Sequence, residues 1–360
     1  MRHRVAAIHR TSGAFLGVLL AWMGLSGATL VLGPDLETLA HPERAAAPPT
    51  GPVSVEAAYR AAEPLIGTDA MERIMVPPEG EARVEFWVGP GGDRRLFVDG
   101  ATSRLLSEHI ESRSYIGRLF AWHSQFEQAD WRRGALGLVG LGLIGASLAG
   151  LYLAWPAIRS RQITARLGTA DRAGLIGLHR IAGLLGLVVV ATNGVTGAYL
   201  ALRTPWQNFF AEKASPPSGS APGPDKANEP IKRPHLDRLL EAADRALPGG
   251  RNTIINPPKK HGGQWRVRRR QDAEWHPNGR SSVFIDPLDL SVKKQDDATK
   301  APLVDRILNL AYPLHTWGWR APWPLRLVHV LCGLALPTLF LTGLLSLRKR
   351  FRNVPGRVFT

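Results

Sequence analysis

The stretch "LIGLHRIAGLLGLVVVATNGVTGAYLAL", residues 175–202, is apolar along almost its whole length, yet a histidine and an arginine stand near its start. Three further blocks, residues 14–32, 134–155 and 327–347, also run with almost no charge. A helix of roughly 20 apolar residues crosses a hydrocarbon core of about 30 Å. The sequence therefore predicts an integral membrane α-helical protein with four transmembrane helices.

Two of these blocks are copies of one pattern. "IHRTSGAFLGVLLAWMGLSGATLVL" (8–32) aligns with "LHRIAGLLGLVVVATNGVTGAYLAL" (178–202), so that His9-Arg10 matches His179-Arg180. A looser pair, "LFAWHSQ" (119–125) and "AYPLHTW" (311–317), precedes the second and fourth helices. The match to an internal helix indicates that the first block is a retained helix and not a cleaved signal peptide. We expect the chain to be two repeats of helix, extramembrane domain, histidine and helix.

The segments between these helices read as small α+β domains. Each has an amphipathic helix (54–67; 235–247) followed by three alternating, strand-like stretches (71–77, 82–89 and 94–106; 252–257, 264–270 and 281–292). A Pro-, Ser- and Gly-rich linker at 214–230 is expected to be disordered. The predicted bounds are 9–32, 134–156, 177–202 and 325–347 for the transmembrane helices, and 53–107 and 235–293 for the domains.

The formal charge of +15 is best explained by membrane topology. Arginines gather in the N-terminus, in the loop 159–172 and in the tail 348–357, which predicts that these segments are cytoplasmic. Both outer domains then face the periplasm from a bacterial inner membrane. No basic motif with interleaved aromatic residues indicates nucleic acid as a partner. The single cysteine, Cys332, excludes an intrachain disulfide, an iron–sulfur cluster and a CxxCH haem attachment site.

The helix-plus-three-strand unit, with its corners "VDGAT" and "IDPLD", resembles the PepSY domain. Two such units between four helices, the "HR…G…TG" helices and the "LHT" before the fourth helix resemble the PepSY-associated transmembrane family. The corners depart from the usual V(D/N)P(x)TG pattern. This family includes inner-membrane ferric-siderophore reductases with two b-type haems, so the resemblance implies haem b and a periplasmic ferric siderophore. It fixes neither the substrate nor the electron donor.

Histidines near membrane helices are the candidate ligands of haem iron. Ionisable groups inside a bilayer are costly and are functional candidates by default. The repeat pairs His9 with His179 on the inner side, and His123 with His315 on the outer side. Two axial imidazoles on each haem would give a centre suited to electron transfer. His329, in the first turn of the fourth helix, could instead replace His123 or His315.

Glycines accompany these histidines at repeated positions. Gly13 and Gly183 follow His9 and His179 by four residues. Gly27 and Gly197 lie 18 residues beyond the same histidines, about 27 Å further along one helix face. Gly150 and Gly343 stand near the inner ends of the second and fourth helices. Such glycines could leave room for a flat macrocycle, or could let helices pack closely.

Two functions remain open. The first is a haem oxidoreductase that passes electrons across the membrane to a periplasmic acceptor; the second is a haem-free PepSY protein that inhibits a protease or senses a periplasmic ligand. No HExxH-like spacing indicates a zinc enzyme. Arg10 and Arg180 either set topology or pair with haem propionates. The remaining histidines are interpreted as surface residues: His3, His41, His109, His235, His261 and His276.

Overall fold

The computed structural model describes residues 1–44, 48–49, 51–125, 130–161, 171–211, 233–259, 263–316 and 321–352. The predicted linker 214–230, His261 and most of the loop 159–172 lie outside these ranges. The chain divides into two compact units, which we describe separately. The first comprises Met1–Pro34, Leu119–Ser215 and Leu314–Thr360, and the second comprises Asp35–Arg118 and Pro216–Pro313.

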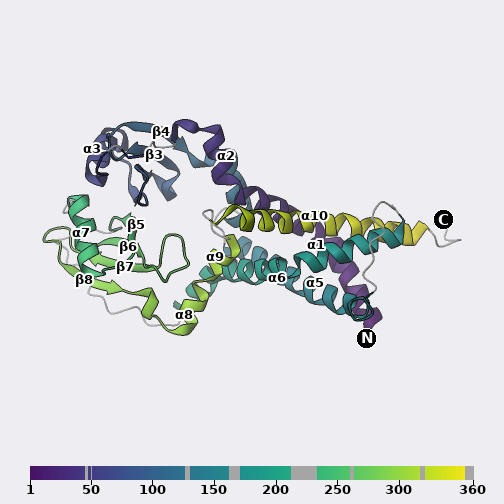
Figure 1. Ribbon diagram of the computed structural model, residues 1–360. Helices are drawn as coiled ribbons and strands as arrows, with labels where there is room; N and C mark the ends of the chain where they lie inside the picture. The colour runs from purple at the N-terminus through teal and green to yellow at the C-terminus, as the bar shows by residue number, and fades with distance from the viewer. Residues whose placement is uncertain are drawn as a thin grey trace. The chain divides into compact units, whose positions relative to one another are not determined.

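The first unit is a bundle of four long helices. They are α1 (Arg2–Val31), α5 (Asp130–Arg159), α6 (Arg172–Ala211) and α10 (Trp323–Arg352). Within the described ranges, these are the four helices that are long and apolar enough to cross a membrane, as the sequence predicted. Each helix extends beyond its apolar block into flanking residues that include arginines. Contacts between α1 and α10, α10 and α6, α6 and α5, and α5 and α1 close the bundle into a ring (Figure 1).

Small residues let these helices approach closely. Gly24 of α1 lies against the backbone of Gly333 in α10, where an added methyl group would collide. A methyl group at Gly140 of α5 would stand 2.9 Å from the carbonyl oxygen of Gly194 in α6. Close backbone contact of this kind replaces hydrophobic burial as a source of helix association in lipid. These glycines are therefore packing positions.

The second unit contains one antiparallel sheet of eight strands in the order β4-β3-β2-β1-β5-β6-β7-β8. The outer segments contribute four strands each and meet where Ile74 of β1 lies opposite Ile255 of β5. A shared hydrophobic core joins both halves of the sheet to α3 (Val55–Ile66) and α7 (Leu236–Ala246). The strands are β1 (Met71–Met75), β2 (Arg83–Val88), β3 (Arg94–Asp99), β4 (Leu105–Ile110), β5 (Arg251–Asn256), β6 (Trp265–Arg270), β7 (Ser281–Ile285) and β8 (Val292–Asp296).

The prediction of three strands in each segment was wrong, because the third predicted stretch leads into a fourth strand, β4 or β8, with which its first strand forms a hairpin. The corners "VDGAT" and "IDPLD" end β3 and β7. The residue that directly follows each of these pentapeptides has a left-handed backbone: Ser103 with φ of 58° and Leu290 with φ of 57°. These are the positions where the usual corner pattern has glycine, which adopts such a conformation without strain.

The N-termini of α3 and α7 exchange carboxylate caps. Asp237 of α7 accepts a hydrogen bond from the backbone N–H of Val55 at 2.8 Å, while Glu56 of α3 accepts one from Leu236 N–H at 2.9 Å. A carboxylate is favourable at a helix N-terminus because backbone N–H groups there have no partner within the helix. The exchange ties the two outer segments together, 180 residues apart in sequence in the case of Glu56 and Leu236.

Shorter elements connect these parts. They are α2 (Gly33–Ala40), η1 (Pro42–Arg44), η2 (Pro90–Gly92), η3 (Glu111–Arg113), α4 (Tyr115–Phe120), the π-helical turn η4 (Ala121–Gln125), η6 (Ala298–Lys300), α8 (Leu303–Leu308) and α9 (Ala311–Thr316). Two of them, η4 and α9, carry the histidines that precede α5 and α10.

Candidate functional site

The helix bundle brings the predicted histidines together in two pairs. The ring centres of His9 and His179 are 6.1 Å apart, and those of His123 and His315 are 6.3 Å apart. The first pair comes from α1 and α6, and the second from η4 and α9. His9 and Gly27, which contacts His123, are 18 residues apart in α1, so the two pairs are separated by about 27 Å along that helix.

Each of the four histidine rings lies against a glycine of another element. A methyl group at that glycine would stand 3.0–3.7 Å from Cε1 of the ring. Four of the six glycines named from the sequence therefore make room for an imidazole, whereas Gly13 has nothing within 4 Å and Gly183 faces Leu339. The pairs are His9 with Gly150, His123 with Gly27, His179 with Gly343 and His315 with Gly197.

A hydroxyl group directly before the glycine orients three of these rings. Nδ1 of His123 lies 2.8 Å from Ser26 Oγ, and Nδ1 of His315 lies 3.0 Å from Thr196 Oγ1. Nδ1 of His179 lies 3.1 Å from Thr342 Oγ1 and 3.0 Å from the carbonyl oxygen of Leu339. The sequence analysis missed these hydroxyls, although a Ser/Thr-Gly pair recurs in "GLSGATL" and "GVTGAYL".

The hydroxyl protons determine which nitrogen of each ring carries hydrogen. Ser26, Thr196 and Thr342 each donate their single proton to the carbonyl oxygen four residues earlier, at 2.7–2.8 Å. A hydroxyl whose proton is used in this way can only accept from the imidazole. Nδ1 of these three histidines must therefore be the N–H donor. In the neutral ring, the lone pair then lies on Nε2, which makes no hydrogen bond within the described residues.

His9 is the exception among the four. The residue before its glycine is Ala149, which has no hydroxyl. Nδ1 of His9 is buried and has no hydrogen-bond partner in the described part of the chain. The pair of His9 and His179 thus contains one oriented ring and one that is held by packing alone.

His329 differs from the four paired histidines. It lies in α10, is 6% exposed, and its Nε2 is 3.3 Å from Nδ2 of Asn193. The nitrogen that stays free in the paired histidines is thus engaged in His329. The alternative in which His329 replaces His123 or His315 stays a prediction.

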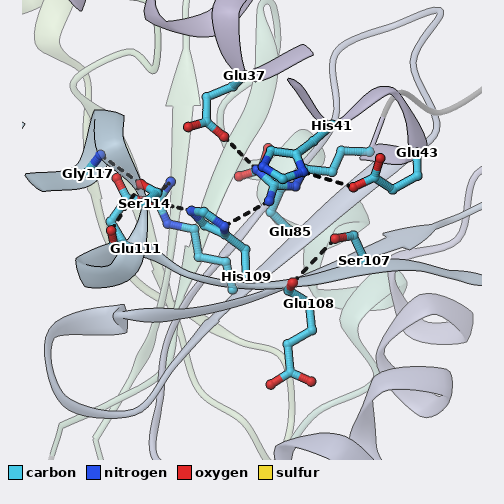
Figure 2. A network of polar contacts seen from close by, with 12 residues as sticks. Glu37, His41, Glu43, Glu85, Ser107, Glu108, His109, Glu111, Ser114 and Gly117 are labelled. Carbon is cyan, nitrogen blue, oxygen red and sulfur yellow. Dashed lines mark hydrogen bonds and ion pairs between the residues drawn. The ribbon is translucent and has the colours of Figure 1, made fainter. Parts of the chain in front are cut away.

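A separate polar cluster lies in the second unit (Figure 2). Arg44 donates to Glu37 at 2.6 Å and to Nδ1 of His109 at 2.9 Å, while Nε2 of His109 lies 3.4 Å from Glu111. Burial, followed by the charge of Arg44, lowers the pKa of His109. The interpretation of His109 as a surface residue was therefore wrong: it is 9% exposed and helps attach α2 and η1 to β4.

His276 was also wrongly interpreted as a surface residue. It is buried, and its ring stacks on Tyr312 at 4.9 Å between centres. Its Nδ1 accepts a hydrogen bond from Asn278 N–H at 3.2 Å. We assign it a structural role in the second unit.

Comparison with known proteins places the chain in a family. No curated protein matches the sequence. The sequence model described as the PepSY-associated TM region matches residues 6–350, which covers both outer segments and all but the outermost residues of the four long helices. Four apolar helices together with this match make the chain a multi-pass membrane protein. The protein belongs to the PepSY-associated transmembrane family.

Proposed function

We propose that the protein binds two haems b and passes electrons across the membrane to a ferric siderophore. The observation that carries the proposal is the pairing of four histidines, three of them with a free Nε2, at two levels of one helix bundle. In this reading His9 and His179 hold the inner haem, and His123 and His315 hold the outer one.

The donor set fits haem better than a bare metal ion. An iron between two imidazoles separates their ring centres by about 6 Å, because each metal–nitrogen bond is about 2 Å. Both pairs have this separation. In the described ranges, no group of three or more His, Cys, Asp and Glu residues could hold an ion. Two histidines are too few for an isolated ion but suffice where a macrocycle supplies four more nitrogens.

The protein's own residues would set the properties of the site. A bound haem would supply one-electron chemistry through its ferric and ferrous states. Ser26, Thr196 and Thr342 hold the tautomer whose Nε2 can bind iron, as outer hydrogen bonds do for metal-binding histidines. The glycine contacts fix where each ring stands. Reduction of the iron in a ferric siderophore on the outer side would lower the affinity of the siderophore for the metal.

The visible spectrum of the purified protein tests the proposal. Protein from haem-replete cells should show sharp, reducible b-type bands and about two haems per chain, and a ferric siderophore should reoxidise the reduced form. His179→Ala should lose one haem and His315→Ala the other. The double variant His9→Ala/His179→Ala should lose little more haem than either single variant, because the two residues act as one unit.

The exposed His235 provides the matched control. His235→Ala should keep both haems. A colourless wild-type protein would refute the proposal and favour the haem-free regulatory alternative. Full haem content in the His179→Ala protein would refute the inner site.

A further inference from the structure

One face of the eight-stranded sheet is basic and aromatic. The core face carries residues such as Val84, Phe86 and Val267 beneath α3 and α7, so the alternate residues of each strand lie on the opposite face. There, Arg95 lies opposite Trp87, and Trp87 opposite Arg73. In the other half, Arg266 lies opposite Phe284, and Phe284 opposite Lys294.

Three arginines on this face have no carboxylate partner within the described residues: Arg73, Arg266 and Arg268. Arg73 stacks on Trp87 at 4.6 Å, and Arg266 donates to Ser282 Oγ at 3.0 Å. Nε of Arg73 and Nε of Arg268 are buried without an acceptor. Nε of Arg95 is likewise buried without an acceptor, but Arg95 pairs with Glu111 at 3.1 Å through a terminal nitrogen, and Lys294 pairs with Asp296 at 2.9 Å.

Arg268 is buried among other arginines that repel it. Burial lowers the pKa of Arg268 to about 10, with further lowering by Arg266, Arg280 and Arg73. Burial also lowers the pKa of Arg73 and of Arg266. Glu72, Asp296 and Glu274 each raise the pKa of one of these arginines, but less than burial lowers it. An anion placed among the arginines would offset the remaining cost of burying their charges.

The spacing of the three arginines favours a ligand with more than one anionic group. Arg73 on β1 and Arg266 on β6 are in register across β5, so their backbones are about 10 Å apart at about 4.8 Å per strand. Arg266 and Arg268 are two residues apart on one strand face, about 7 Å. A guanidinium binds a carboxylate through two parallel hydrogen bonds. Several carboxylates on one small molecule match this layout better than a single phosphate.

We infer that Arg73, Arg266 and Arg268 form a binding site for a small polycarboxylate, free or as its ferric chelate, with Trp87 and Phe284 as flanking apolar surfaces. Binding at this site does not depend on the proposed haems. If the proposed function holds, the ferric chelate would be its electron acceptor.

Calorimetry on the full-length protein in an uncharged detergent tests this site, with citrate and ferric citrate as probes. Citrate should bind with an affinity that falls at high salt, and acetate and inorganic phosphate should bind at least tenfold more weakly. Arg268→Gln and Arg73→Gln should each weaken citrate binding at least tenfold. Without citrate, Arg268→Gln should melt no lower than the wild type, because it removes a repelling charge.

Arg245→Gln is the matched control, since Arg245 is an exposed residue of α7. It should leave citrate binding unchanged. Equal citrate binding by the Arg268→Gln and wild-type proteins would overturn the site, as would the absence of any citrate binding. Binding of detergent-solubilised phosphatidylglycerol without binding of citrate would overturn it in favour of a lipid headgroup. Neither outcome bears on the haem spectrum, so the two proposals fail separately.

Discussion

The four histidine contacts differ at one residue, Ala149, and that difference makes the two sites unequal. Three histidines donate from Nδ1 to a hydroxyl, whereas His9 meets an alanine at the corresponding place. A hydrogen bond from Nδ1 makes an imidazole a stronger electron donor to the metal, which favours ferric iron. We therefore expect the ferric form of the proposed inner haem to be less stabilised by hydrogen bonding than the ferric form of the outer haem.

Ala149→Ser should restore the missing contact. The new hydroxyl would accept from Nδ1 of His9 and lower the midpoint potential of the inner haem by roughly 20–60 mV, which corresponds to a hydrogen bond of about 0.5–1.5 kcal/mol. Thr342→Val should move the same potential upward by less, because the carbonyl oxygen of Leu339 still accepts from Nδ1 of His179. A redox titration followed in the visible spectrum measures both. Ala146→Ser, on the same helix, is the control, and an unchanged potential in Ala149→Ser would contradict the role given to the hydroxyl.

The histidine pairs could be predicted from sequence, but their surroundings could not. The alignment of His9 with His179 requires only that two repeats fold alike. The contact between a glycine and a particular ring depends on which helices are neighbours, and small residues alone do not specify a neighbour. The burial of His109 was also hidden, because Arg44 reaches it from 65 residues away.

Among the elements, the paired N-termini of α3 and α7 hold the second unit together. Glu56 is 4% exposed and accepts from Arg233 at 2.6 Å as well as from Leu236 N–H. Burial alone would raise the pKa of Glu56, but Arg233, Leu236 and Arg60 outweigh it and hold that pKa at about 2. Because the folded pKa is below the ordinary value of 4.5, the carboxylate stabilises the fold above pH 4.5, and this contribution is lost as the pH falls through about 2.

Glu56→Gln should therefore lower the free energy of unfolding at neutral pH by about 2–3 kcal/mol. It should also flatten the loss of stability between pH 4.5 and 2. Both effects can be measured by thermal unfolding of the full-length protein in detergent and, separately, by hydrogen exchange in the first turn of α7. Glu241→Gln removes an exposed pair with Arg245 at 3.8 Å and should change little. Wild-type melting of Glu56→Gln at pH 7 would show that the exchanged caps do not hold the unit.

Strand positions were predictable to the extent that one face of each strand is apolar. Residues 82–89 alternate clearly, and β2 occupies Arg83–Val88. The fourth strand of each segment was missed because β4 and β8 lie at the sheet edges, where neither strand has an alternating buried face. The pairing of β1 with β5 joins segments about 180 residues apart, and nothing in the local pattern of either strand specifies that partner.

For the whole molecule, this pairing constrains the membrane topology. A sheet that runs from β4 to β8 without interruption requires both outer segments to be on the same side of the membrane. An even number of spans must then separate them, and the two helices between them, α5 and α6, meet that requirement. The argument is independent of the charge distribution, yet it agrees with the four spans predicted from the apolar blocks.

The distribution of the arginines predicts which side of the membrane the sheet faces. They gather at the N-terminus before α1, between α5 and α6, and in the tail after α10, which predicts that these ends are cytoplasmic. Reporter fusions at residues 165 and 355 should therefore report the cytoplasm, and fusions at 110 and 220 the periplasm. If the fusions at 110 and 220 reported different sides of the membrane from each other, the continuous sheet itself would be contradicted. A periplasmic report at 165 with matching results at 110 and 220 would keep the sheet but exchange the two haem sites, placing His9 and His179 nearest the periplasm.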